Sequence, residues 1–120
     1  MITAVLGASP KPDRYSNKAI RMLMEYGHEV VPVHPVHQEI EGLSVVAGLA
    51  ALESESIDTL TMYINADRSA TLGEIIVSLN PRRVIFNPGA ENLELAKRLG
   101  LDGIEVEEAC TLVLLRTGAY

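Results

Sequence analysis

The residues best suited to chemistry lie between Gly7 and Ser16, in a stretch rich in turn formers and polar donors. Ser9 and Ser16 offer hydroxyls, and Arg14 offers a guanidinium group that can bind phosphate oxygens through two parallel hydrogen bonds. An amphipathic segment follows directly, so free helix amides and the positive end of the helix dipole face the same place. The pattern predicts an anion site. A surface turn with a capping serine and a solvated arginine is the competing interpretation.

No set of nucleophile, base and orienting acid is recognisable. Cys110 is the single cysteine and has no identifiable base partner, so a buried or idle thiol is preferred over a nucleophile. His34 is either a polar wall against a ligand or a strand-end residue with no task. The histidines lack metal-ligand spacing, and we expect no metal site. The polar groups suit the binding of phosphate and adenine better than a reaction.

Short apolar segments alternate with amphipathic ones along the chain. The expected strands are Ile2–Leu6, Glu29–Val33, Leu43–Val46, Ile57–Ile64, Arg83–Phe86 and Gly103–Val106. The expected helices are Asn17–Tyr26, one turn at Leu49–Leu52, Asp67–Leu79 and Glu91–Leu99, whereas Cys110–Leu115 fits strand or helix. This order predicts one α/β domain over residues 1–120, a three-layer Rossmann-like fold with a doubly wound parallel sheet of about five strands.

Single residues indicate how these elements begin, end and pair. Ser16 is the expected N-cap of the first helix, and Asn65 or Asp67 that of the third. Gly100 is the expected stop of the last predicted helix. Pro32 removes a ladder donor, which places its strand towards a sheet edge or at a bulge.

The ends of the predicted strands locate the ligand. In a doubly wound sheet it lies outside their carboxyl ends, which here carry residues 7–16, His34-Pro35, Tyr63–Asn65 and Asn87–Ala90. The last could offer amides to an anion, although a plain strand-to-helix turn is the stronger interpretation from the residues alone. The Gly-x-Gly-x-x-Gly fingerprint is absent, and His34 stands where an acidic residue would hold the ribose of NAD, which disfavours unmodified NAD.

The composition of the chain disfavours two classes of partner, nucleic acids and membranes. The formal charge is −6, with 16 acidic and 10 basic residues, so a nucleic-acid partner is not expected. No apolar stretch reaches the roughly 18 residues of a membrane span, and no basic segment precedes the first apolar run. We therefore expect a cytoplasmic protein that does not engage membranes.

Three segments and a cysteine together resemble a known family. The segments are Gly7-Ala8-Ser9-Pro10-Lys11-Pro12-Asp13-Arg14-Tyr15-Ser16-Asn17-Lys18, Val31-Pro32-Val33-His34-Pro35 and Asn87-Pro88-Gly89-Ala90-Glu91, followed by Cys110. They are similar to the small stand-alone CoA-binding proteins, which look like the CoA-binding domain of the succinyl-CoA synthetase α subunit reduced to one Rossmann-like unit. The resemblance covers nearly the whole chain.

The resemblance implies a site for coenzyme A or a related adenine nucleotide. The pyrophosphate would lie near Ser9, Arg14 and Ser16, the adenosine beside the second strand's end, and the pantetheine along Asn87–Ala90. The predicted cofactor-binding set is Gly7, Ala8, Ser9, Arg14, Tyr15, Ser16, Val33, His34, Pro35, Asn65, Asn87, Pro88, Gly89 and Ala90.

Binding without catalysis is expected, because the synthetase's phosphohistidine belongs to a second domain. The expected partner is CoA or acyl-CoA, with a homodimer through Leu112–Leu115 or an acyl-CoA enzyme as candidate protein partners. Two alternatives stay open: a thioester-handling enzyme that uses Cys110 or His34, and a protein-interaction domain without ligand.

Overall fold

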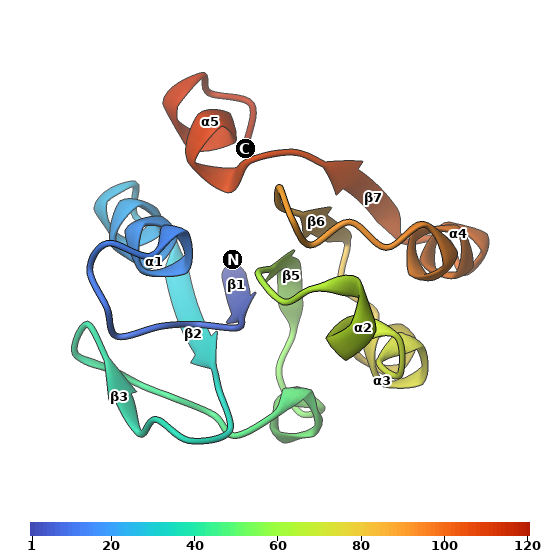
Figure 1. The fold of residues 1–120 in the computed structure, drawn as a ribbon, viewed down its shortest axis with the longest axis horizontal. Helices are drawn as coiled ribbons and strands as arrows, with labels where there is room; N and C mark the ends of the chain where they lie inside the picture. The colour runs from blue at the N-terminus through green and yellow to red at the C-terminus, as the bar shows by residue number, and fades with distance from the viewer.

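A five-stranded parallel sheet forms the centre of the molecule, as the computed structural model of all 120 residues shows (Figure 1). Its strands are β1 (Ile2–Leu6), β2 (Glu29–Val33), β5 (Ile57–Met62), β6 (Arg83–Phe86) and β7 (Glu105–Glu108). They lie in the order β2-β1-β5-β6-β7, and every neighbouring pair is parallel. The predicted fold class is confirmed, and Pro32 lies on an edge strand as expected.

Helices cover both faces of the sheet (Figure 1). One face carries α1 (Tyr15–Glu25) and α5 (Thr111–Arg116), which contact each other. The opposite face carries the 3₁₀ turn η1 (Leu49–Leu52), α2 (Ala66–Ser69), α3 (Gly73–Leu79) and α4 (Leu93–Leu101). None of these helices is long and apolar enough to cross a membrane.

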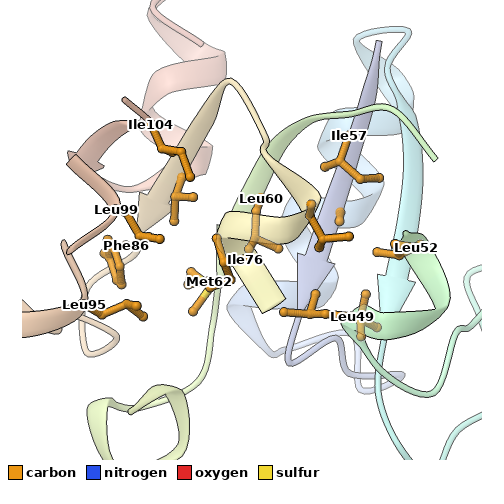
Figure 2. Packing of buried hydrophobic residues seen from close by; sticks show 14 of the residues in the cluster. Leu49, Leu52, Ile57, Leu60, Met62, Ile76, Phe86, Leu95, Leu99 and Ile104 are labelled. Carbon is orange, nitrogen blue, oxygen red and sulfur yellow. The ribbon is translucent and has the colours of Figure 1, made fainter. Parts of the chain in front are cut away.

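Side chains of the strands contribute alternately to two hydrophobic clusters, because successive residues of a strand point to opposite faces of the sheet. On β1, Ala4 belongs to the larger cluster of 15 buried residues, and Val5 to the cluster of seven under α1 and α5. In Figure 2, Leu60 and Met62 of β5 pack with residues of α3 and α4 in the larger cluster. The many aliphatic residues of the chain therefore fill the interior on both sides of the buried sheet.

A hairpin follows β2. Its strands are β3 (Glu39–Ile40) and β4 (Leu43–Ser44), paired antiparallel and joined by Glu41 and Gly42. The sequence predicted the second of these strands, with a longer range, but not the first, since two residues carry no periodicity.

Residues 67–79 form two helices, where one was expected. The first, α2, is a single turn capped by Asn65, whose Oδ1 accepts the Arg68 amide at 3.0 Å. Asn92 donates from Nδ2 to Ser69 Oγ at 2.9 Å and fixes the end of this turn from the neighbouring segment. The apolar spacing survives in α3, where Ile76 and Leu79 are buried. Tertiary contacts thus divide a segment whose periodicity alone favours one helix.

Several other boundaries differ from the predictions, among them the end of β5 at Met62 and the start of α4 at Leu93. The N-cap of α1 is Arg14, and Ser16 lies inside the first turn, so the predicted serine cap is wrong. The helix α4 continues through Gly100, and the chain turns at Gly103, whose φ of +83° requires glycine. This turn delays β7, which begins at Glu105. Residues 111–116, left open between strand and helix, form α5.

Candidate functional site

The strand order reverses between β1 and β5, and the segments that follow these two strands lie against each other. The Tyr63 amide donates to the Leu6 carbonyl at 2.9 Å. Gly7 has φ +84°, and a Cβ there would come within 2.9 Å of Ile64 Cγ2 and 3.0 Å of the Tyr63 carbonyl oxygen. Only glycine fits this crossing, which opens a crevice at the carboxyl edge of the sheet.

Three adjoining pockets make up this crevice. The histidine pocket, about 320 Å³, lies beside the end of β2 and is lined among others by Val33, His34, Pro35, His37 and Arg68. The loop pocket, about 320 Å³, is lined by Gly7, Ser9, Lys11, Arg14, Tyr15, Ser16 and Tyr63. The cysteine pocket, about 280 Å³, is lined by Tyr15, Tyr63, Asn87, Pro88 and Cys110.

Shared residues show that the pockets form one groove. Tyr63 lines all three pockets, Gly7 and Ser9 line the histidine and loop pockets, and Tyr15 lines the loop and cysteine pockets. The groove therefore runs along the ends of β2, β1, β5 and β6.

The loop pocket presents hydrogen-bond donors. The amides of Tyr15, Ser16 and Asn17 make no hydrogen bond within the chain, and the first helical amide to do so is that of Lys18, with Arg14 O at 3.0 Å. No acidic side chain lies in the first turn of α1. Arg14 is exposed and takes part in no ion pair. Free amides, a guanidinium and the positive end of the helix dipole together suit an anion.

The histidine pocket gathers three nitrogen-bearing side chains. His34 Nδ1 accepts the Val36 amide at 3.1 Å, so the neutral ring carries its proton on Nε2. The His37 ring lies 4.4 Å away between centroids. Burial lowers the pKa of His34, and the charges of His37 and Arg68 lower it further. The three groups suit an anion, because a bound negative charge would oppose this mutual repulsion.

The cysteine pocket is built on a saturated polar network. Buried Asn87 donates from Nδ2 to Thr61 Oγ1 at 2.6 Å and to the Met62 carbonyl at 3.0 Å. Its Oδ1 accepts the Thr111 amide at 2.9 Å. The Asn87 side chain therefore joins β6 to β5 and α5, and it shapes the pocket while its polar atoms bond within the protein.

The residues that line the cysteine pocket with Cys110 include no histidine, lysine or carboxylate. Burial raises the pKa of Tyr63 to about 12, so this phenol keeps its proton. Its hydroxyl oxygen is buried and makes no hydrogen bond, and Tyr63 is one of the residues that line the groove.

Eleven of the fourteen predicted cofactor-binding residues line the groove, and Asn65, Gly89 and Ala90 line none of its three pockets. Asn65 caps α2. The Gly89 amide donates to Glu91 Oε1 at 2.8 Å, and the Ala90 amide donates to the Asn87 carbonyl at 2.8 Å. Both amides of this turn are therefore already bonded within the chain.

The predicted cofactor-binding set omits several groove residues, among them Lys11, His37, Tyr63 and Arg68. Lys11 and Tyr63 lie in segments that the strand-end rule already marked. His37 and Arg68 reach the groove from beyond those segments, and no periodic signal marks them.

Residues 2–116 match the sequence model of the CoA binding domain family. The chain belongs to this family. In the curated relative YneT of Bacillus subtilis (strain 168), an uncharacterized protein, 71 residues align at 28% identity. They cover 59% of this chain and 52% of YneT, so the match spans about half the length of that relative.

Solved structures share the fold of this CoA binding domain. A crystal structure of an uncharacterized protein has 39% sequence identity and a TM-score of 0.89, and the match covers 99% of this chain and 97% of the other. A Thermus thermophilus protein has 30% identity and a TM-score of 0.89, with 99% and 90% covered.

A larger protein contains the same fold as one part. The acetyl-coenzyme A synthetase 1 of Ca. Korarchaeum cryptofilum, in complex with phosphate and ADP, matches at 22% identity and a TM-score of 0.76. The match covers 90% of this chain and 25% of that protein, and it shows the fold alone.

Proposed function

We propose that this CoA binding domain binds coenzyme A, or a related adenine nucleotide, without catalysing a reaction on it. The observation that carries the proposal is the set of unbonded amides of Tyr15, Ser16 and Asn17, beside Arg14 at the switch point of the sheet. Helix amides and a guanidinium are the groups that bind a diphosphate in other proteins. Membership of the CoA binding domain family supports the choice of ligand.

The chemistry of each pocket supports an order for the ligand along the groove. The diphosphate would lie in the loop pocket, and the adenosine in the histidine pocket against Val33, His34 and Pro35. His34, His37 and Arg68 would together face the 3′-phosphate, which coenzyme A carries and ADP lacks. The pantetheine arm would extend past Tyr63 and Pro88 to the cysteine pocket, whose lining is mainly apolar.

Titration calorimetry with coenzyme A, dephospho-CoA, ADP and NAD tests the proposal. We expect saturable binding of the first three, strongest for coenzyme A, and weaker binding of NAD. Arg14→Ala should weaken coenzyme A binding by about 1–3 kcal/mol, because it removes a charge-assisted hydrogen bond.

Arg116→Ala is the matched control, since Arg116 is exposed, makes no ion pair and lies outside the groove. Absence of saturable binding for all four compounds would overturn the proposal and favour a protein-interaction domain.

A second candidate is a thioester-handling enzyme, favoured by the position of Cys110 in the lining of the cysteine pocket. Incubation with an acyl-CoA tests it. Turnover that is lost in Cys110→Ser supports the enzyme, and an unchanged acyl-CoA removes it. The protonated Tyr63 gives Cys110 no base, which is why binding alone ranks first.

A further inference from the structure

The loop that precedes α1 is held from its inner side by one buried side chain. Asn17 is 0% exposed, and its Nδ2 donates to the Ser9 carbonyl at 2.9 Å. Its Oδ1 accepts a hydrogen bond from Arg21 Nε at 2.8 Å, and Arg21 Nη2 donates to the Pro12 carbonyl at 2.8 Å. Two loop carbonyls, of Ser9 and Pro12, are thus bonded to side chains of α1.

The same asparagine also reaches the hairpin of β3 and β4. Its Nδ2 donates to Glu41 Oε2 at 3.1 Å, so a carboxylate from the hairpin helps to fix the orientation of the Asn17 amide. The four residues Ser9, Asn17, Arg21 and Glu41 join three segments that are separate in the sequence.

Glu41 is an unfavourable residue for the turn that it occupies. Glu41 and Gly42 form the two-residue connection between β3 and β4, with φ angles of 51° and 77°. Positive φ at both positions is the requirement of a type I′ turn, which favours asparagine, aspartate or glycine at the first position. A glutamate is strained there. Asparagine would suit the turn better but would lack the reach of the longer carboxylate.

We infer that Glu41 and Asn17 are positioning residues for the diphosphate, and that the hairpin supports the ligand site from behind without lining it. The inference rests on the proposed function. The hydrogen bond from Asn17, whose amide Glu41 helps to orient, holds the Ser9 carbonyl towards α1, so the negative end of the carbonyl dipole points away from an anion. The groove side of the loop is then left to the donors: the α1 amides, the Ser16 hydroxyl and Arg14.

Glu41→Asn separates positioning from folding, because it improves the turn and removes the contact with Asn17. We expect an unchanged or higher urea midpoint, faster hydrogen exchange at Ser9–Arg14 in the ligand-free protein, and ADP binding about tenfold weaker. Glu41→Gln keeps an acceptor oxygen of the same reach and should restore about half of the lost binding energy, roughly threefold in affinity.

The control is Glu39→Gln, which removes the same charge from the same hairpin at a side chain that makes no hydrogen bond or ion pair. It should bind ADP like the parent protein.

Unchanged loop exchange and ADP affinity in Glu41→Asn overturn the inference, and a fall in the urea midpoint alone would show that Glu41 serves only the hairpin. If the parent protein binds neither ADP nor coenzyme A, the proposed function fails. The assignment to a diphosphate then fails with it, and loop exchange in the ligand-free variants decides only whether Glu41 and Asn17 order the loop.

Discussion

At the scale of single residues, the groove combines backbone donors that do not titrate with His34, which does. The backbone amides of Tyr15, Ser16 and Asn17 donate at every pH, whereas His34 changes its charge. Because its pKa lies below the ordinary value of 6.5, His34 is neutral at pH 7. An anion beside it would favour the imidazolium, so binding of the anion and uptake of a proton are linked.

The linkage predicts a pH dependence for coenzyme A. As the pH falls through the pKa of His34, the ring gains a positive charge and contributes more to binding of the 3′-phosphate. Between pH 7.5 and 5.5, the affinity ratio of the parent protein to His34→Asn should therefore rise by about three- to tenfold. The ratio cancels protonation of the phosphate itself.

Calorimetry at the two pH values measures this ratio. With dephospho-CoA in place of coenzyme A, the ratio should stay nearly constant. An equal rise for both ligands would place the 3′-phosphate away from His34.

At the scale of elements, the site depends on how closely the ends of β1 and β5 approach. Gly7→Ala would add a methyl group at φ +84°, 3.0 Å from the Tyr63 carbonyl oxygen, a backbone atom that has little freedom to move. We expect a loss of about 1–3 kcal/mol in the free energy of unfolding, since backbone strain and overpacking add.

Gly100→Ala is the matched control for urea unfolding. Gly100 lies inside α4, its φ is not positive, and a Cβ there would meet open space. Alanine should stabilise the helix by about 0.5–1 kcal/mol. Equal effects of the two substitutions would contradict the close crossing at Gly7.

Sequence patterns predicted those helices, strands and loops that are encoded by residues close together in the chain. The alternation of strands and helices, the edge position of Pro32 and the loop after β1 follow from periodicity and backbone chemistry. The division of residues 67–79 could not be predicted, because Asn92 and Ser69 meet only in the folded chain. In the apolar run Leu112–Leu115, Leu112 and Leu115 are buried and Val113 is 50% exposed, so a dimer contact through this run stays a prediction.

The interior network of the site was equally beyond sequence reasoning. Asn17 and Arg21 lie on one helix at a spacing of four residues, which predicts neighbours. Glu41, however, comes from a hairpin of two-residue strands, and its contact with Asn17 exists only in three dimensions. Tyr63 belongs to a segment marked as a strand end, but only the folded topology shows that this residue lines all three pockets.

At the scale of the whole molecule, the charge of the groove differs from the charge of the chain. The formal charge is −6, yet Lys11, Arg14, Arg68 and the two histidines line the groove. Parallel strands place their carboxyl ends at one edge, so a single groove receives residues from all parts of the sequence. An extended ligand can then contact both sides of the switch point.

The order of the pockets predicts which segments each ligand protects from hydrogen exchange. ADP, with no pantetheine arm, should protect residues 7–18 and 33–37 at the loop and histidine pockets. Coenzyme A should protect the same segments and also residues 110–113 at the cysteine pocket, where its arm would lie over Cys110. Both ligands are compared at equal saturation, because the free energy that binding adds depends on ligand concentration relative to Kd.

Protection of residues 110–113 by ADP would reverse the order of adenosine and pantetheine along the groove. Protection by coenzyme A that stops at residues 7–18 would leave the pantetheine arm in solvent and would free Cys110 from any part in binding.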